Sequence, residues 1–219
     1  LKIFNDKMPI DEKVFLFFRI PIVLCFVGHG AFGFITEDGK MGKVAWLTFY
    51  RIFGFEPDLV YKFMLMPLVG MIDFFIAFMV IVVPTRGVFA WATFWCFFTA
   101  LLRPVSGQGL SEFFERGGNY GLPLALLVYC GLNFRSFKDW FSPIHPPNMK
   151  SDNVNRAILI LKFAIAFLLI GHGSFFIFNE NNQRDYLFQH WAAVGILLTP
   201  ISILLMGWFE VGLGMLVFF

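Results

Sequence analysis

The sequence predicts an all-α, polytopic membrane protein in which one helical unit occurs twice. Three observations predict it: an apolar composition, long uninterrupted apolar runs, and a pattern of glycine, histidine and acidic residues that recurs at a fixed spacing. Of the 219 residues, 58% are hydrophobic and 15% are charged, and the mean hydropathy is +0.72. A soluble domain is typically about half apolar and a quarter charged, so this composition excludes one.

Six apolar runs approach the roughly 20 residues that a membrane-crossing helix needs. A transmembrane barrel would show short segments of alternating hydrophobicity instead, so we expect helices. Little of the chain is left for a separate soluble domain. The runs cover residues 14–36, 59–83, 88–106, 118–133, 157–178 and 192–219.

Charge and cysteine usage narrow the class further. The net charge of +2 is small and the basic residues are dispersed, so nucleic acid is not an expected partner. Cys25, Cys96 and Cys130 stand alone in separate runs, which predicts packing residues and no metal site. Mixed charges before the first run argue against a cleaved signal peptide. We expect a lipid-embedded protein of the bacterial cytoplasmic membrane, with its N-terminus on the cytoplasmic side.

The first and fifth runs share a pattern. When His29 is placed on His172, 143 residues later, the residues around both histidines match. Gly70 and Asp73 of the second run match Gly207 and Glu210 of the sixth in the same way. Such agreement in a chain rich in Phe, Leu and Ile indicates an internal duplication. The other matched pairs are Arg19 and Lys162, Gly28 and Gly171, Gly30 and Gly173, Phe32 and Phe175, and Glu37 and Glu180.

The duplication predicts how the chain is divided. Residues 1–134 form a four-helix unit, residues 135–156 form a proline-containing linker, and residues 157–219 form the first two spans of a second unit. Because the last run ends without a polar flank, we expect the native chain to continue. Four spans separate the copies, so both should have the same membrane orientation.

Two motifs resemble the DoxX-like family of small four-helix membrane proteins. The first is a basic residue ahead of a Gly-His-Gly turn, and the second is Gly-x-x-acid followed by apolar residues, as in "GWFEVGLGMLVFF". The resemblance covers the first two spans of both copies and, more loosely, the third and fourth runs. It implies a four-helix fold, and some relatives are membrane subunits of quinone-linked oxidoreductases such as thiosulfate:quinone oxidoreductase. The tandem arrangement differs from the usual single unit.

His29 and His172 are the candidate ligand-binding residues. Glycine on both sides of each histidine lets another helix or a planar ligand approach closely. One interpretation is a pocket for a quinone-like ligand, with haem or a metal ion less favoured. The other is a helix-packing device in which each imidazole bonds a neighbouring helix. The flanking glycines are Gly28, Gly30, Gly171 and Gly173.

Asp73 and Glu210 occupy equivalent positions inside their runs. Ionisable groups at membrane depth cost roughly 2.5–3.5 kcal/mol each, so they normally face partners inside the protein. They serve either as proton-relay groups or as hydrogen-bonding groups that fix the helices. Arg19, Lys162 and Arg103 are the candidate cationic partners.

The segment between the third and fourth runs is the most polar part of the chain. Glu112 and Arg116 are four residues apart, which predicts an ion pair on a helix. Ser111 is the expected N-cap of that helix, and Pro104 predicts a bent entry to the next span. The segment forms either the rim of a polar pocket or an ion-paired loop. Its remaining polar members are Arg103, Ser106, Gln108, Glu115 and Asn119.

These features leave three functional classes open. The first is a redox-associated subunit that binds a quinone-like ligand near the Gly-His-Gly helices, with other membrane subunits as partners. The second is a scaffold subunit without chemistry. The third is a transporter of protons or small solutes, since repeats with polar groups at the membrane midplane are common in transporters.

Overall fold

The computed structural model describes most of the chain, and within the described part the regular structure is helical. Glu37 and Glu180, which the repeat pairs, lie outside the described residues. The described residues are 8–34, 41–62, 64–132, 136–144, 151–178, 189–193, 195 and 198–219.

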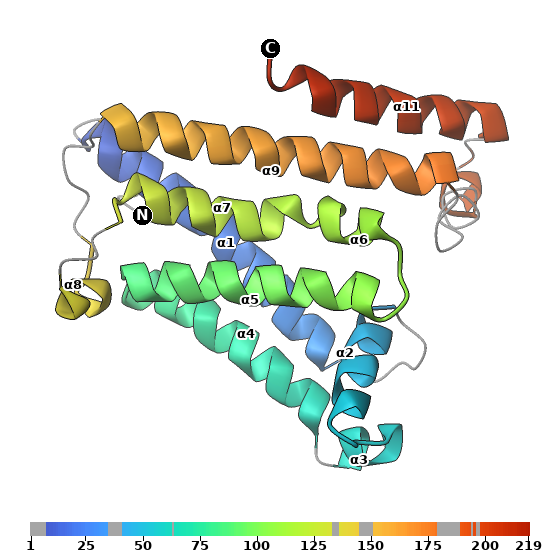
Figure 1. The fold of residues 1–219 in the computed structure, drawn as a ribbon, viewed down its shortest axis with the longest axis horizontal. Helices are drawn as coiled ribbons and strands as arrows, with labels where there is room; N and C mark the ends of the chain where they lie inside the picture. The colour runs from blue at the N-terminus through green and yellow to red at the C-terminus, as the bar shows by residue number, and fades with distance from the viewer. Residues whose placement is uncertain are drawn as a thin grey trace.

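Ten helices are named in Figure 1. Thr85 begins α5 by accepting a 3.2 Å hydrogen bond from the backbone of Val88, and Thr199 begins α11 with a capping box closed by Ser202. The helices are α1 (Ile10–Gly33), α2 (Met41–Ile52), α3 (Pro57–Lys62), α4 (Leu65–Val82), α5 (Arg86–Val105), α6 (Leu110–Glu115), α7 (Gly117–Tyr129), α8 (Phe137–Phe141), α9 (Ser151–Phe178) and α11 (Pro200–Leu216).

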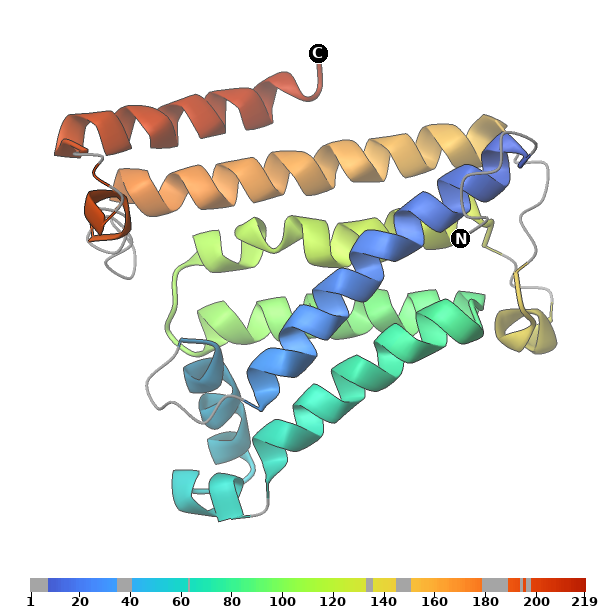
Figure 2. The same ribbon diagram turned by 180° about the vertical axis from the view of Figure 1, so that it is seen from behind.

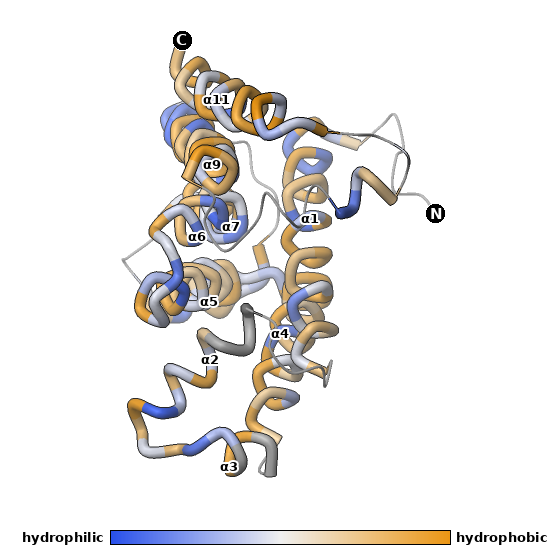
Figure 3. The backbone as a smooth tube through the Cα atoms, turned by 90° about the vertical axis from the view of Figure 1, so that its right-hand side faces the viewer, coloured by the Kyte–Doolittle hydropathy of each residue, from blue (hydrophilic) through white to orange (hydrophobic). Residues whose placement is uncertain are grey.

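The long helices form two layers. One layer stacks α5, α6 with α7, α9 and α11 in that order, and the other contains α1 and α4 (Figure 3). Figure 2 shows α1 crossing the first layer diagonally. Helices α1 and α9 run in the same direction, and α4 and α11 each return antiparallel to them (Figure 1).

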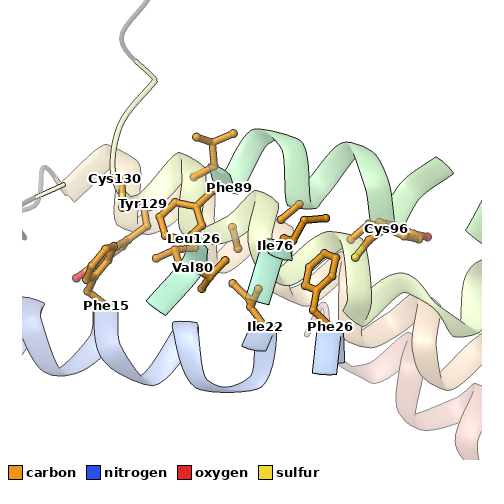
Figure 4. Packing of buried hydrophobic residues seen from close by; sticks show 14 of the residues in the cluster. Phe15, Ile22, Phe26, Ile76, Val80, Phe89, Cys96, Leu126, Tyr129 and Cys130 are labelled. Carbon is orange, nitrogen blue, oxygen red and sulfur yellow. The ribbon is translucent and has the colours of Figure 1, made fainter. Parts of the chain in front are cut away.

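The core lies where α1, α4, α5 and α7 meet (Figure 4). Phe26 of α1, Val80 of α4, Phe89 of α5 and Leu126 of α7 are each at most 1% exposed. The opposite faces of these helices carry exposed apolar side chains, among them Phe75 at 62%. Apolar residues on the outer face are expected where that face meets lipid rather than water.

Four of the described helices are long and apolar enough to cross a membrane, namely α1, α4, α5 and α9. The fourth apolar run begins inside α7, which starts at Gly117 after the break at Arg116 and has only 13 residues. In the sixth run, Gly195 has a φ of 79° and α11 begins only at Pro200, which leaves 17 residues. The second run is likewise divided, since Met64 has a φ of 53° between α3 and α4.

Two local expectations are wrong. Gly109, not Ser111, is the N-cap of α6, and it makes no side-chain cap hydrogen bond; Ser111 lies inside the helix and is buried. The entry to the next span is broken at Arg116, between α6 and α7, and not at Pro104, which lies in the last turn of α5. The chain reverses after it at Gly107, whose φ of 85° favours glycine.

Candidate functional site

Helices α1, α2, α4 and α5 and the junction of α6 with α7 surround a polar cavity of about 70 Å³. This volume holds a few water molecules, and it is less than half of the roughly 150 Å³ that admits benzene. We call it the polar cavity. Its polar lining comes from His29, Asp73, Thr99, Arg103 and Arg116, and its aromatic lining comes from Phe32 and Trp46.

Asp73 anchors one wall of the polar cavity. Its side chain is 4% exposed, and the indole nitrogen of Trp95 on α5 donates a 2.6 Å hydrogen bond to it. On α1, the Nδ1 atom of His29 lies 4.0 Å from the sulfur of Cys25, one helical turn earlier. His29 and Asp73 both line the polar cavity. Polar side chains of α1, α4 and α5 thus lie around one cavity.

Two ion-paired arginines, Arg103 and Arg116, form another wall. Arg116 contacts the carboxylates of Glu112 and Glu115 at 2.6 Å each, which confirms the predicted pair four residues apart. Arg103 lies 3.8 Å from Glu112 and donates a 3.1 Å hydrogen bond to Gln108. The Glu112 side chain is only 3% exposed, so removing its cationic partners would leave a buried charge.

Most of the predicted glycines pack helices. A Cβ added to Gly30 would lie 3.0 Å from the backbone oxygen of Gly70 on α4, and also 3.0 Å from the ring of Phe74. Gly171 packs against the backbone of Glu115 at the end of α6. Gly28 differs, because no atom lies within 4 Å of the Cβ position there. In α1, the glycine after His29 therefore lets α4 approach closely, whereas the glycine before it makes no such contact.

The second helix pair repeats the first contact at the matched positions. A Cβ on Gly173 would lie 2.5 Å from the backbone oxygen of Gly207 and 3.0 Å from Val211. Val211 follows Glu210 as Phe74 follows Asp73, so the same two positions of the partner helix are touched in both pairs. Close approach of backbones at small residues is a common way to join membrane helices.

The two histidines have different surroundings. His172 is paired with Glu210 through a 2.7 Å contact between Nδ1 and a carboxylate oxygen, and its ring packs edge-on against Phe176. In the first pair Trp95 holds the acid, so His29 is left to face the polar cavity. The acid of the first pair thus accepts a hydrogen bond from a tryptophan on a third helix, whereas the acid of the second pair contacts its histidine.

Arg19 and Lys162 do not bond the acids among the contacts that the structure describes. The guanidinium of Arg19 instead donates to the backbone oxygens of Val80 at 2.9 Å and Ile81 at 2.5 Å, at the end of α4. A cation that bonds the last carbonyls of a helix stabilises that end. Lys162 is half-buried on α9. Arg103 lines the polar cavity but bonds Gln108 and Glu112.

A second cavity, of about 220 Å³, lies between α1 and α7. We call it the lateral cavity. It is larger than the roughly 150 Å³ that admits a benzene ring. Its walls are Pro21, Ile22, Cys25 and Phe26 on α1, with Gly118, Asn119 and Leu122 on α7.

Sequence reasoning did not single out Trp95, Trp46 or Cys25 as site residues. Trp95 and Trp46 lie among many aromatic residues, and nothing in their spacing distinguishes a hydrogen-bonding indole from a packed one. Cys25 precedes His29 by four residues, which places both on one face of a helix. That spacing was the one feature of the sequence that could have placed Cys25 beside His29.

Comparison with family models, with curated proteins and with solved structures gives no match. Function is therefore inferred from the two cavities and from the chemistry of the residues that line them.

Proposed function

We propose that this integral membrane protein is a redox-associated subunit that binds a quinone-like planar ligand at α1. The ring occupies the lateral cavity and the polar cavity supplies the protons. One observation carries the proposal: a ring-sized apolar cavity and a cavity lined by ionisable groups adjoin the same helical turn, from Cys25 to His29. Ligand sites typically combine apolar walls with a few placed polar groups.

The chemistry of a quinone suits this pair of cavities. Its ring needs apolar walls, its carbonyl oxygens need hydrogen-bond donors, and its reduction takes up two electrons and two protons. Asn119 is the amide donor in the lateral cavity. Ionisable residues at membrane depth mark functional sites by default, because each is costly to bury. His29 and Asp73 are the proton-exchanging groups, and Arg103 and Arg116 pair with Glu112 beside them.

Another hollow, of about 330 Å³, lies over α4 and α5 beside Phe141 of α8. Its lining is apolar apart from Thr85, and it includes no ionisable side chain. A ring bound there would have no proton donor on the wall. We therefore assign the ligand to the lateral cavity.

The proposal includes a tandem, DoxX-like organisation with six spans. Its support is that the Gly30 and Gly173 contacts fall on matching positions of α4 and α11. That α1 and α9 run the same way also supports a parallel repeat (Figure 1). In this arrangement residues 1–134 and 157–219 are the two units joined by a linker, the N-terminus is cytoplasmic, the membrane is the bacterial cytoplasmic one, and other membrane subunits are partners.

A binding measurement tests the proposed ligand. The protein is placed in lipid nanodiscs, a short-chain benzoquinone is titrated, and quenching of tryptophan fluorescence is followed. Asn119→Leu should weaken binding about 2- to 10-fold, the equivalent of one lost hydrogen bond of about 0.5–1.5 kcal/mol. Leu122→Trp should abolish binding by filling the cavity. Asn153→Leu, the same change at the start of α9, is the matched control and should bind as the wild type does.

Equal weak quenching in all four proteins would contradict the proposal and favour a scaffold without a ligand. A transporter is the second candidate, favoured by the break between α6 and α7 at Arg116, beside buried charges. Proton flux into liposomes that contain the protein, lost in Asp73→Asn and unaffected by the quinone, would favour transport instead.

A further inference from the structure

The ion pair between His172 of α9 and Glu210 of α11 is only partly covered. The two side chains are 44% and 23% exposed, although α9 is long and apolar enough to cross a membrane and α11 is a shorter apolar helix. Ionisable groups in such helices normally face the interior of a bundle, because their exposure to lipid is costly. Among the described helices, α11 is the outermost of its layer, with α9 on its inner side (Figure 3). A cover for the pair is therefore not found within the described part of the chain.

Two apolar side chains extend this exposed site along α11. Met206 lies about one turn before Glu210 and Leu213 about one turn after it, so the three residues share one face of the helix. Met206 is 36% exposed and Leu213 is 38% exposed. We call Met206, Glu210 and Leu213 the α11 stripe.

The matching stripe of α4 is covered by further helices. Val69, Asp73 and Ile76 stand at the positions that the repeat pairs with the α11 stripe, and each is at most 7% exposed. Trp95 of α5 bonds the acid, and Ile76 belongs to the core that α4 forms with α5 and α7. The first helix pair thus shows how a stripe of this kind is completed, namely by another helix with a polar group for the acid.

The polar groups beside the α11 stripe are complementary to themselves. Nδ1 of His172 contacts one carboxylate oxygen of Glu210 at 2.7 Å, and no hydrogen bond joins Nε2 or the other oxygen to the residues that the structure describes. In the ion-paired form both ring nitrogens carry a proton. One copy of the site therefore offers an outward donor and an outward acceptor, which are the groups that a second copy needs.

We propose that two copies of this chain form a dimer through the α11 stripe and His172. A twofold contact brings identical patches together, so Nε2 of His172 donates to Glu210 of the second copy and the reverse bond is made as well. Two copies with the same membrane orientation hold these groups at the same depth without further adjustment. Met206 and Leu213 supply the apolar contact around them. The inference goes beyond the proposed function and does not involve the quinone.

Energy transfer between labelled copies of the complete chain tests the proposal. Copies with a donor or an acceptor dye at the N-terminus are mixed in liposomes and diluted stepwise with lipid. Transfer in the wild type should exceed that of random proximity and follow a monomer–dimer equilibrium. Glu210→Gln, which removes the charge of the acceptor, and Leu213→Trp, which overfills the contact, should each weaken dimerisation at least about fivefold.

Leu205→Trp is the matched control, because it adds the same ring to α11 at an exposed residue outside the α11 stripe. It should dimerise as the wild type does. A wild type that is monomeric at every dilution would overturn the proposal and leave a helix of another protein as the cover. Equal association of the two tryptophan variants would overturn it as well. Both variants should bind the benzoquinone normally, because α1 and α7 form the lateral cavity, so failure of the dimer leaves the proposed function standing.

Discussion

Substitution of Gly70 by Ala should weaken the packing of α1 against α4. The added Cβ would lie 2.6 Å from the backbone oxygen of Gly30. A backbone atom cannot rotate away as a side chain can, so the two helices must separate by several tenths of an ångström. Overpacking of this kind typically costs about 1–3 kcal/mol. Alanine also stabilises a helix by up to about 1 kcal/mol relative to glycine, which partly offsets that cost.

Gly28→Ala is the matched control, because it makes the same chemical change inside α1 where no atom lies within 4 Å of the new Cβ. The helix-propensity gain is then common to both variants. Their free energies of unfolding should differ by the overpacking cost of about 1–3 kcal/mol, with Gly70→Ala less stable. Reversible unfolding of the purified proteins by SDS in mixed micelles measures the difference. Equal stability of the two variants would refute the claim that these glycines hold α1 and α4 together.

Three further outcomes follow from the packing and the polar contacts. Gly207→Ala, whose Cβ would lie 2.7 Å from a backbone oxygen of α9, should cost as much in the same SDS assay as Gly70→Ala does; no loss would count against the repeat. Trp95→Phe should lower the free energy of unfolding by about 1–3 kcal/mol, because it removes the donor to buried Asp73, and the loss should largely disappear when Asp73 is also changed to Leu. Arg116→Met should be more damaging, at about 3–5 kcal/mol, since it strips the 2.6 Å partner from buried Glu112; a cost below about 1 kcal/mol would mean that Arg103 alone neutralises that carboxylate.

The helical class and the membrane-length helices were accessible from the sequence because composition and continuous apolar runs report them directly. The number of helices long enough to cross a membrane could not be predicted in this way. Met64 and Gly195 each interrupt or shorten a run through a left-handed backbone conformation that hydropathy does not register. The Glu112–Arg116 pair was predictable, since spacing on one helix fixes it.

The candidate site was predictable only in part, because it is assembled from several helices. The sequence indicated His29 and Asp73, but the role of Trp95 depends on how α5 packs against α4. Arg19 looked like a partner for a buried acid, yet its reach takes it to the carbonyls at the end of α4.

Photoaffinity mapping tests the central claim most directly, because it reports where the ring lies. The protein in nanodiscs is illuminated with an azido-substituted short-chain benzoquinone and digested, and labelled peptides are identified by mass spectrometry. The label should fall on residues 21–26 of α1 and 118–122 of α7, the walls of the lateral cavity, and excess unlabelled quinone should suppress it. Labelling spread over the lipid-facing side chains of α4 and α11, insensitive to competition, would contradict the assignment of a quinone-like ligand to this protein.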